Sequence, residues 1–350
     1  MTLLSFRNVL VTPYSDLLQA GVDRLVHRGG PHWPDFDRQR EARHRRHGKP
    51  ADHEPRRQEP AGRLAGGWAW AGPICTHFGH QILEFSMRVA PTLASDPGAR
   101  FLFAPGLRGY PASVDEAPAF VRAVLSWFDI APTRCRVLAN PVTVDELLVA
   151  PQSEQLGGPG PSADHLDLMD AHTHRRLGDL RRRGTVYVSR AGMPARFAGE
   201  AFLEEALARC GVHVVRPETI SLDVQLSTYA SAERLIFAEG SAVYGPLLMG
   251  RSLADVVVLK RFREGRLGKP MLEPRAQSLR YYPVITDLVP GRAQSGRMTD
   301  FAGIALIDEE LLLESFDRLD IPLRRHWDPR RYGELRDHDV DTHHRAVQQI

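Results

Sequence analysis

The chain has 350 residues, of which 43% are hydrophobic and 25% are charged, and these are ordinary values for a globular protein. Single hydrophobic cores rarely grow beyond about 250–300 residues, so the length favours two domains. The formal net charge is only +2 at pH 7, which excludes a uniformly basic surface of the kind that binds nucleic acid or an anionic membrane.

Targeting signals are not evident in the sequence. No apolar run approaches the roughly 18 residues that span a bilayer, and the first residues lack the basic and then apolar pattern of a signal peptide. The cysteines Cys75, Cys135 and Cys210 lie far apart without metal-binding spacing, which favours thiols in a reducing compartment. We therefore expect a cytoplasmic protein without a transmembrane segment, able to dock on a membrane only peripherally.

Residues 36–60 are almost wholly polar and contain a cluster of arginines together with three prolines. This composition predicts a solvated insertion or mobile loop. The alternative is a lid, or a patch that binds a phosphate-bearing substrate. Composition alone does not distinguish this alternative from a solvated loop.

Apolar residues between 76 and 91 recur at helical spacing and predict one helix, with Thr76 as its N-cap and Pro91 at its end. His80, Glu84 and Arg88 follow one another at intervals of four and form a second stripe on this helix. Farther along, short apolar runs predict strands at 101–103 and 136–139 and a helix at 120–128. We expect these elements to form an N-terminal α/β domain over residues 1–165, which ends in a Gly- and Pro-rich linker at 151–163.

The second half alternates more regularly between strands and helices. Strands are predicted at 185–189, 212–215, 234–238 and 255–259, with helices at 200–210, 221–230 and 241–249 between them. This alternation predicts a parallel sheet and a Rossmann-like domain over residues 180–265. Residues 266–350 form a C-terminal extension with a helix at 307–319, which packs peripherally or back on the N-terminal domain. The polar stretch from Arg324 onward is expected to pack peripherally or fray.

Ligands of open α/β sheets bind beyond the carboxyl ends of the strands, and two segments occupy that position here. Arg190, after the first of these strands, offers a bidentate donor to a pyrophosphate. Gly240, Ser241 and Ala242 let a ligand approach the backbone at the start of a helix, where N–H groups attract phosphate. Glu239 suits hydroxyl groups of a ribose or a sugar. A plain strand–helix turn is the alternative for Gly240 and Ser241.

Taken together, these segments resemble glycosyltransferase family 61. The resemblance covers about residues 66–260 and is best at 185–250. In the donor domain it is carried by Tyr187, Ser189, Arg190, Pro217, Glu218, Gln225, Glu239, Gly240, Ser241 and Ala242. The segment ICTHFGHQILE (74–84) resembles the N-terminal signature of the family, with His80 and Glu84 at its histidine and acidic positions.

The resemblance implies a GT-B-like α/β fold in which two Rossmann-like domains face a cleft. It also implies an inverting hexosyl- or pentosyltransferase that moves a sugar from a nucleotide-diphosphate donor to a glycan, a lipid-linked acceptor or another hydroxyl group. In bacterial relatives this activity serves surface polysaccharide biosynthesis. No metal and no further cofactor is expected, and nucleic acid is not an expected partner.

An inverting transfer needs a general base on the acceptor hydroxyl and support for the leaving diphosphate. His80 and Glu84 are therefore the expected catalytic pair, as a base and its orienting partner. The expected donor-binding residues are Ser189, Arg190, Arg196, Glu218, Gln225, Glu239, Gly240, Ser241 and Ala242.

Two other function classes remain open. A metal-dependent hydrolase would use histidine pairs such as His77 with His80, His172 with His174, or His343 with His344. A non-catalytic relative that binds a nucleotide or a sugar is the other alternative, since Tyr244 stands where bacterial relatives often have a histidine. The D-x-D patterns within residues 337–341 lie in a polar tail and are expected to be solvated.

Overall fold

A computed structural model describes residues 3–19, 25–105, 113–293 and 296–348, with only the backbone described at 15–19 and 25–26. The chain divides into two compact units. We call Met1–Gly178 together with Leu247–Arg251 the N-terminal unit, and Asp179–Pro246 together with Ser252–Ile350 the C-terminal unit.

The N-terminal unit is built on a mixed sheet with the strand order β5-β2-β1-β9-β6-β7-β8. Strands β9, β6, β7 and β8 run parallel, and β1 pairs antiparallel with both β9 and β2. The sheet strands are β1 (Leu4–Gln19), β2 (Leu25–Pro31), β5 (Asp52–His53), β6 (Arg63–Ile74), β7 (Phe101–Pro105), β8 (Cys135–Val137) and β9 (Val142–Val149), and a separate ribbon is formed by β3 (Arg45–Arg46) and β4 (Lys49–Pro50).

The helical segments of this unit are α1 (Phe78–His80), the π-helix η1 (Gln81–Phe85), α2 (Val89–Ser95), α3 (Ala119–Trp127), the 3-10 helix η2 (Pro132–Arg134) and α4 (Ala163–Leu177). The single helix predicted between 76 and 91 is therefore wrong. His77 rather than Thr76 caps its start, and the π-helix breaks the α-helical pattern. Pro91 lies in the first turn of α2, where a backbone N–H has no intrahelical partner to lose.

Residues 36–60 are not a solvated loop throughout. Arg43, His44, Arg46 and Asp52 are buried, although Arg38 is exposed. The charges are tolerated because they are paired: Arg43 Nε donates to Asp52 at 2.8 Å, and Arg46 binds Glu84. Composition predicted solvation here because it reports the polarity of a segment but not which charged side chains form ion pairs in the fold.

The C-terminal unit contains a sheet with the order β11-β10-β12-β13-β14, in which all neighbours run parallel. The parallel sheet predicted from the strand–helix alternation is confirmed. Its strands are β10 (Thr185–Val188), β11 (His213–Val215), β12 (Arg234–Ala238), β13 (Leu253–Lys260) and β14 (Ala276–Pro283), and β15 (Ile285–Arg292) pairs antiparallel with β16 (Met298–Ile307).

The helical segments of the C-terminal unit are α5 (Glu200–Arg209), η3 (Pro217–Thr219), α6 (Leu222–Ser231), η4 (Ser241–Leu248), α7 (Lys269–Leu272), η5 (Glu273–Arg275), α8 (Glu309–Asp317), η6 (Leu323–His326) and α9 (Pro329–Gln348), of which those labelled η are 3-10 helices. The last two residues of η4 already belong to the N-terminal unit. Ser221 caps α6 as expected, since its side chain accepts a hydrogen bond from Val224 N. Gly211, with φ of 79°, follows the end of α5 in the left-handed conformation that glycine adopts most easily.

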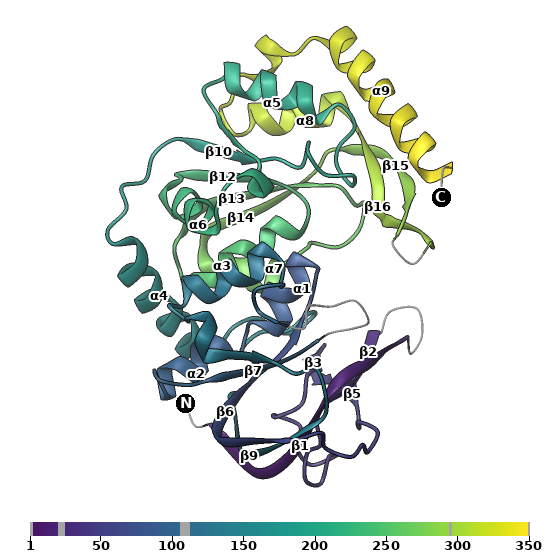
Figure 1. Ribbon diagram of the computed structural model, residues 1–350. Helices are drawn as coiled ribbons and strands as arrows, with labels where there is room; N and C mark the ends of the chain where they lie inside the picture. Colours follow the sequence, from purple (N-terminus) through teal and green to yellow (C-terminus); the bar gives the residue numbers. More distant parts are fainter. Residues whose placement is uncertain (1–2, 20–24, 106–112, 294–295, 349–350) are drawn as a thin grey trace. The chain divides into compact units, whose positions relative to one another are not determined.

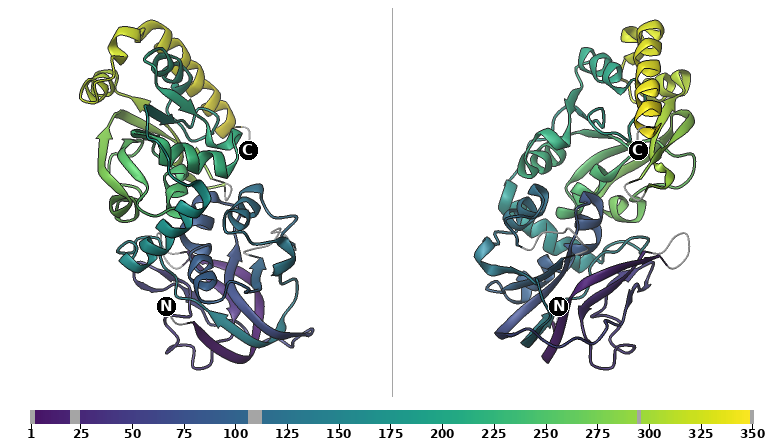
Figure 2. Two further views of the ribbon diagram at one scale, coloured as in Figure 1. Left: turned by 90° about the vertical axis from the view of Figure 1, so that its left-hand side faces the viewer. Right: turned by 45° about the vertical axis from the view of Figure 1, so that its right-hand side comes forward.

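The end of the chain does not fray within the described residues. It forms the 20-residue helix α9, which lies beside α5 and the β15–β16 hairpin (Figures 1 and 2). Tyr332 of α9 is fully buried, and its ring lies against Gly199 at the start of α5. Tertiary packing therefore stabilises a helix whose sequence is too polar to suggest it.

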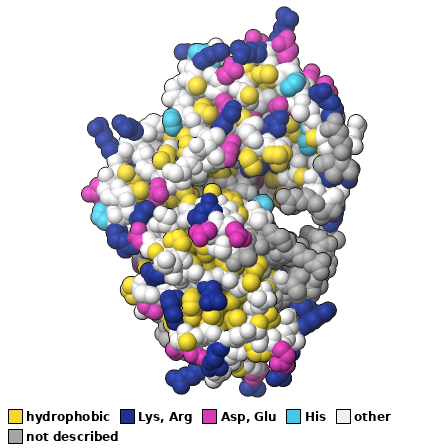
Figure 3. Space-filling model, in the orientation of Figure 1, with side chains coloured by type: hydrophobic (Ala, Val, Ile, Leu, Met, Phe, Trp, Pro, Cys, Tyr) yellow, Lys and Arg dark blue, Asp and Glu magenta, His cyan; other side chains and the backbone are white. Residues whose placement is uncertain are grey.

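Separate clusters of buried apolar side chains lie in the N-terminal and in the C-terminal unit. No helix among the described residues is long and apolar enough to cross a membrane. The three cysteines, which all lie in described segments, form no disulfide bond. On the face shown in Figure 3, basic and acidic side chains are interspersed, in keeping with the small net charge.

Candidate active site

In the N-terminal unit, polar side chains gather around the carboxylate of Glu84, in the helical segment that follows β6. Glu84 is 2% exposed and lies in the π-helix η1. Its Oε1 accepts hydrogen bonds from His80 Nδ1 at 2.6 Å and Arg46 Nη2 at 3.1 Å, and its Oε2 accepts from His44 Nε2 at 3.0 Å and from Arg46 Nε. We call Glu84, His80, His44 and Arg46 the Glu84 cluster.

The cluster keeps Glu84 ionised. Burial alone would raise the pKa of this carboxyl group, but the hydrogen bonds from His44 and His80 and the charge of Arg46 hold it well below its usual range. An ionised carboxylate only accepts hydrogen bonds, so the facing ring nitrogens of both histidines must carry protons. Glu84 is therefore a weak proton acceptor and a strong orienting group.

His80 is the member of the cluster that reaches the surface. Its side chain is 33% exposed, whereas that of Glu84 is fully buried. Because Nδ1 donates to Glu84, the neutral ring has its lone pair on Nε2, as in a histidine that a carboxylate orients for general base catalysis. The predicted pair, His80 and Glu84, is thus in contact, with His80 partly exposed and Glu84 buried.

His44 and Arg46 were missed by the sequence reasoning. They lie 40 and 38 residues before Glu84, within the polar segment 36–60. Arg88 helps to hold that segment in place, since its Nη2 donates to the carbonyl oxygens of Ala42 at 3.1 Å and Arg43 at 2.8 Å. The run of basic residues at 43–46 was visible, but no local pattern pairs it with a glutamate so far away.

In the C-terminal unit, four neighbouring parallel strands deliver polar residues at their carboxyl ends. In sheet order, β11 is followed by Glu218, β10 by Arg190, β12 by Glu239 and β13 by Arg261. Val188 pairs with Phe237, and Ala238 with Leu259, so these ends lie at one edge of the sheet. This is the edge where open α/β sheets bind ligands.

Arg190 lies directly against Gly240. A Cβ atom at Gly240 would overlap the Arg190 guanidinium, so the glycine is needed for this contact. Arg190 Nε donates to the carbonyl oxygen of Ala195 at 2.9 Å, and burial lowers the pKa of the guanidinium. Ser241 and Ala242 are half-buried and open the 3-10 helix η4 beside this contact.

Two buried glutamates organise the backbone around Arg190. Glu239 is fully buried, and it accepts hydrogen bonds from the N–H groups of Arg261, Phe262 and Leu267. These hydrogen bonds hold the loop after β13 and engage both carboxylate oxygens, and the expected contact of Glu239 with substrate hydroxyls stays a prediction. Glu200, which the sequence reasoning did not single out, accepts in the same manner from Arg190 N at 2.8 Å, and it also accepts from the Ser189 hydroxyl group at 3.1 Å.

The remaining donor-side predictions divide into one exposed residue and two with internal partners. Glu218 is exposed, and its carboxylate lies over Gly192, so it can reach a ligand hydroxyl. Gln225 is buried, and its Nε2 donates to Pro217 O at 2.7 Å, which holds the turn that carries Glu218. Arg196 donates to Asp339 Oδ1 of α9 at 2.7 Å and is already neutralised.

Asp339 belongs to the D-x-D patterns that were expected to be solvated, and for this residue that expectation is wrong. Its side chain is 19% exposed, and its carboxylate accepts hydrogen bonds from Arg196 and from Gly199 N. Asp341 in the same tail is exposed. The carboxylate of Asp339 thus anchors α9 to the start of α5.

The histidine pairs of the hydrolase alternative have other contacts. His77 accepts from His80 N, His172 Nε2 contacts Trp127 O at 2.9 Å, and His343 Nε2 contacts Pro290 O at 3.0 Å. Within the described residues, no group of three His, Cys, Asp or Glu side chains is placed to hold a metal ion.

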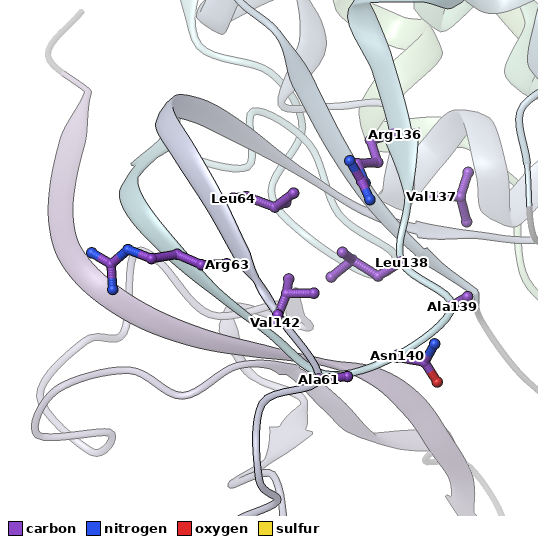
Figure 4. Close-up of a pocket in the computed structure, with 10 residues that line it drawn as sticks. Ala61, Arg63, Leu64, Arg136, Val137, Leu138, Ala139, Asn140 and Val142 are labelled. Carbon is purple, nitrogen blue, oxygen red and sulfur yellow. The ribbon is translucent and has the colours of Figure 1, made fainter.

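A cavity of about 230 Å³ lies at the other end of β6 from the Glu84 cluster. Leu64, Leu138 and Val142 gather at its centre, and Arg63 extends away from them (Figure 4). The cavity contains none of the predicted site residues.

No curated protein matches the chain. The sequence model of the family Glycosyltransferase 61 matches residues 78–257, which is just over half of the chain. The matched range includes His80, Glu84, Arg190 and Gly240, whereas Arg46 and Arg261 lie outside it. The chain therefore belongs to the Glycosyltransferase 61 family and is a glycosyltransferase.

Proposed function

We propose that the protein is an inverting glycosyltransferase that transfers a hexose or a pentose from a nucleotide-diphosphate sugar to a hydroxyl group of a glycan or a lipid-linked acceptor. The observation that carries the proposal is the contact of Arg190 with Gly240 at the carboxyl ends of β10 and β12. A guanidinium beside a glycine backbone and a helix start suits the two phosphates of a leaving nucleotide.

On the acceptor side, His80 is the proposed general base. Its Nε2 would take the proton of the attacking hydroxyl group while Glu84 stabilises the imidazolium that forms. The ionised state of Glu84 supports this division of roles, since an ionised carboxylate stabilises positive charge on a histidine that it contacts. Glu84 then acts as the positioning residue.

On the donor side, Arg190 would neutralise charge that develops on the diphosphate as the sugar leaves. The proposed phosphate site would be lined by Ser189, Gly240, Ser241 and Ala242. Glu218 would accept a hydrogen bond from a hydroxyl group of the sugar donor. Glu239, Gln225 and Arg196 would act indirectly, through the loops and the helix that they hold.

At a larger scale, we propose the GT-B arrangement, with an acceptor domain, residues 1–165, a donor domain, residues 180–265, and a C-terminal extension, residues 266–350, whose strand β14 completes the sheet of the donor domain. We further propose that transfer requires no metal ion. Surface polysaccharide biosynthesis in the bacterial cytoplasm, with peripheral docking at a membrane, is the proposed setting. These points rest on the family to which the chain belongs.

The experiment that tests the proposal is a thermal-shift screen of the purified chain with UDP, GDP, CMP and their sugar conjugates, with and without EDTA. We expect one nucleoside diphosphate to raise the melting temperature equally in both conditions. A ligand at a hundredfold excess over its Kd stabilises the folded state by about 2.7 kcal/mol. Arg190→Ala should lose most of this shift, and Arg183→Ala, which alters an exposed arginine just before β10, should keep it.

Other outcomes would contradict the proposal in separate ways. The absence of any shift, together with a loss of stability in EDTA, would favour a metal-dependent enzyme. A nucleotide-induced shift without transfer or hydrolysis of any bound donor would favour a non-catalytic relative.

A further inference from the structure

We propose that Arg261 is a second diphosphate-binding residue, which acts together with Arg190, and that a phosphoryl oxygen of the donor replaces the carbonyl group of Ala195 that both arginines contact. This inference rests on the proposed function. It adds a binding residue that lies beyond the range matched by the family, which ends at residue 257.

The two arginines converge on one oxygen atom. Arg190 Nε donates to the Ala195 carbonyl at 2.9 Å, and Arg261 Nη1 donates to the same carbonyl at 2.5 Å. Arg190 follows β10 and Arg261 follows β13, and these two strands lie on either side of β12 in the sheet. A carbonyl oxygen has two lone pairs, so these two donors saturate it.

Arg261 has an unused donor in a buried position. The residue is 1% exposed, and its Nε has no hydrogen-bond partner among the residues that the structure describes. A buried donor without a partner costs free energy, so an arginine kept in this state needs an explanation. A phosphate oxygen would supply the missing acceptor and could bind two nitrogens of the fork at once.

The two guanidinium groups at Ala195 also lack a direct ion pair with any described residue. Within the described parts of the chain, no carboxylate forms an ion pair with Arg190 or Arg261. The nearby Glu200 and Glu239 are instead engaged by backbone N–H groups. Burial and the positive charge of Arg190 lower the pKa of Arg261 to about 10, while Glu200 and Glu239 act in the opposite direction.

This environment suits a diphosphate better than a single phosphate. Two guanidinium groups that approach one point from different strands can each bind one phosphoryl group of a diphosphate. Access requires that the Ala195 carbonyl leaves its position, and the turn at residues 191–196 that carries it contains the exposed residues Gly192, Met193 and Pro194. Binding would therefore exchange one neutral acceptor for several charged ones.

Inorganic pyrophosphate is the probe, because the base and the sugar of the donor are not identified. Its affinity is measured by calorimetry for the wild-type chain, Arg261→Gln and the matched control Arg263→Gln. Arg263 lies two residues farther along the same loop, and its side chain is 71% exposed. We expect Arg261→Gln to weaken pyrophosphate binding about 10- to 100-fold, as for the loss of charge-assisted hydrogen bonds, and to affect orthophosphate much less. The control should change pyrophosphate binding less than about twofold.

The outcomes separate the inference from the proposed function. Pyrophosphate binding that needs Arg190 but not Arg261 would overturn the inference and leave the proposed function intact. A wild-type chain that binds neither pyrophosphate nor any nucleotide would overturn both. A merely structural role for Arg261 would lower the melting temperature without changing the preference for pyrophosphate over orthophosphate, and that result also counts against the inference.

Two further measurements cover a variant that does not fold. Arg261→Lys keeps the charge and one donor for Ala195 but not the fork, and it should still weaken pyrophosphate binding. In the wild-type chain, pyrophosphate should change amide hydrogen exchange at residues 191–199, because the Ala195 carbonyl is released. Unchanged exchange in this turn at saturating pyrophosphate would overturn the inference without any variant.

Discussion

At the scale of single residues, one buried carboxylate organises the polar cluster of the N-terminal unit. Glu84 accepts hydrogen bonds from two histidines and an arginine, and only His80 among these donors is accessible enough to meet a substrate. The position of His80 follows from its spacing to Glu84, four residues along a helical segment. The environment of Glu84, in contrast, depends on residues from a distant part of the chain.

His80→Ala should lower the turnover number about 100- to 10,000-fold, which is the usual contribution of a general base. The thermal shift caused by the donor nucleotide should not change, because His80 is not part of the proposed donor site. His53→Ala, which removes an exposed histidine of the same unit, serves as the control. Full activity of His80→Ala in a transfer assay would exclude His80 as the base.

Gly240→Ala should weaken nucleotide binding while it leaves the fold nearly as stable as before. The added methyl group would displace the Arg190 guanidinium, which is the flexible end of a side chain and can move without disturbing the sheet. We expect the loss of one charge-assisted contact, about 1.5–3 kcal/mol of binding free energy. Titration of the variant with the identified nucleotide measures this effect, and wild-type affinity would show that the contact does not position Arg190.

At the scale of elements, regular spacing predicted the C-terminal unit better than the N-terminal one. Strands at 185–188 and 234–238, and the cap at Ser221, follow from patterns that lie within each segment. The helix predicted after residue 76 was wrong, since spacing shows which residues share a face but does not distinguish an α-helix from a π-helical turn. Helix α9 was missed because its stability comes from packing against α5 and β15, which no local pattern encodes.

Asp339→Asn should loosen the attachment of α9 and lower the free energy of unfolding by about 1–3 kcal/mol, because Arg196 loses its charged partner. The amide can replace at most one of the two hydrogen bonds that the carboxylate accepts from Arg196 and Gly199. Hydrogen exchange at residues 196–209 should increase. Asp341→Asn, at an exposed position of the same helix, is the control, and equal behaviour of the two variants would contradict this role.

At the scale of the whole molecule, the two units are expected to differ in their response to acid. In the N-terminal unit, His27 is buried against Tyr14, His44 and Phe85. Burial, the neighbouring His44 and Arg46, and to a smaller extent His80, lower the pKa of His27 to about 3, while Glu84 acts in the opposite direction. The folded state therefore excludes a proton that the unfolded chain binds below pH 6.5.

It follows that the contribution of His27 to stability is complete above pH 6.5 and is lost progressively as the pH falls toward 3. Between pH 7 and pH 5 this amounts to about 2 kcal/mol. His27→Phe keeps an aromatic ring and removes the titration, so it should lose less stability over this interval. Tryptophan fluorescence can follow the effect, since Trp33, Trp68, Trp70 and Trp127 belong to the N-terminal unit and only Trp327 to the other. Identical pH profiles of the two proteins would contradict the assignment to His27.

The sequence by itself determined the parallel sheet of the C-terminal unit, the strand ends that carry Arg190 and Gly240, and the family. These follow from spacing within a segment and from the motifs at its end. Only the tertiary structure decided that Arg46 meets Glu84, that Arg261 meets Ala195, and that Asp339 meets Gly199. The partners are 38, 66 and 140 residues apart, respectively. Local spacing specifies neighbours along one helix or strand, whereas contacts over such separations arise only when whole elements pack together.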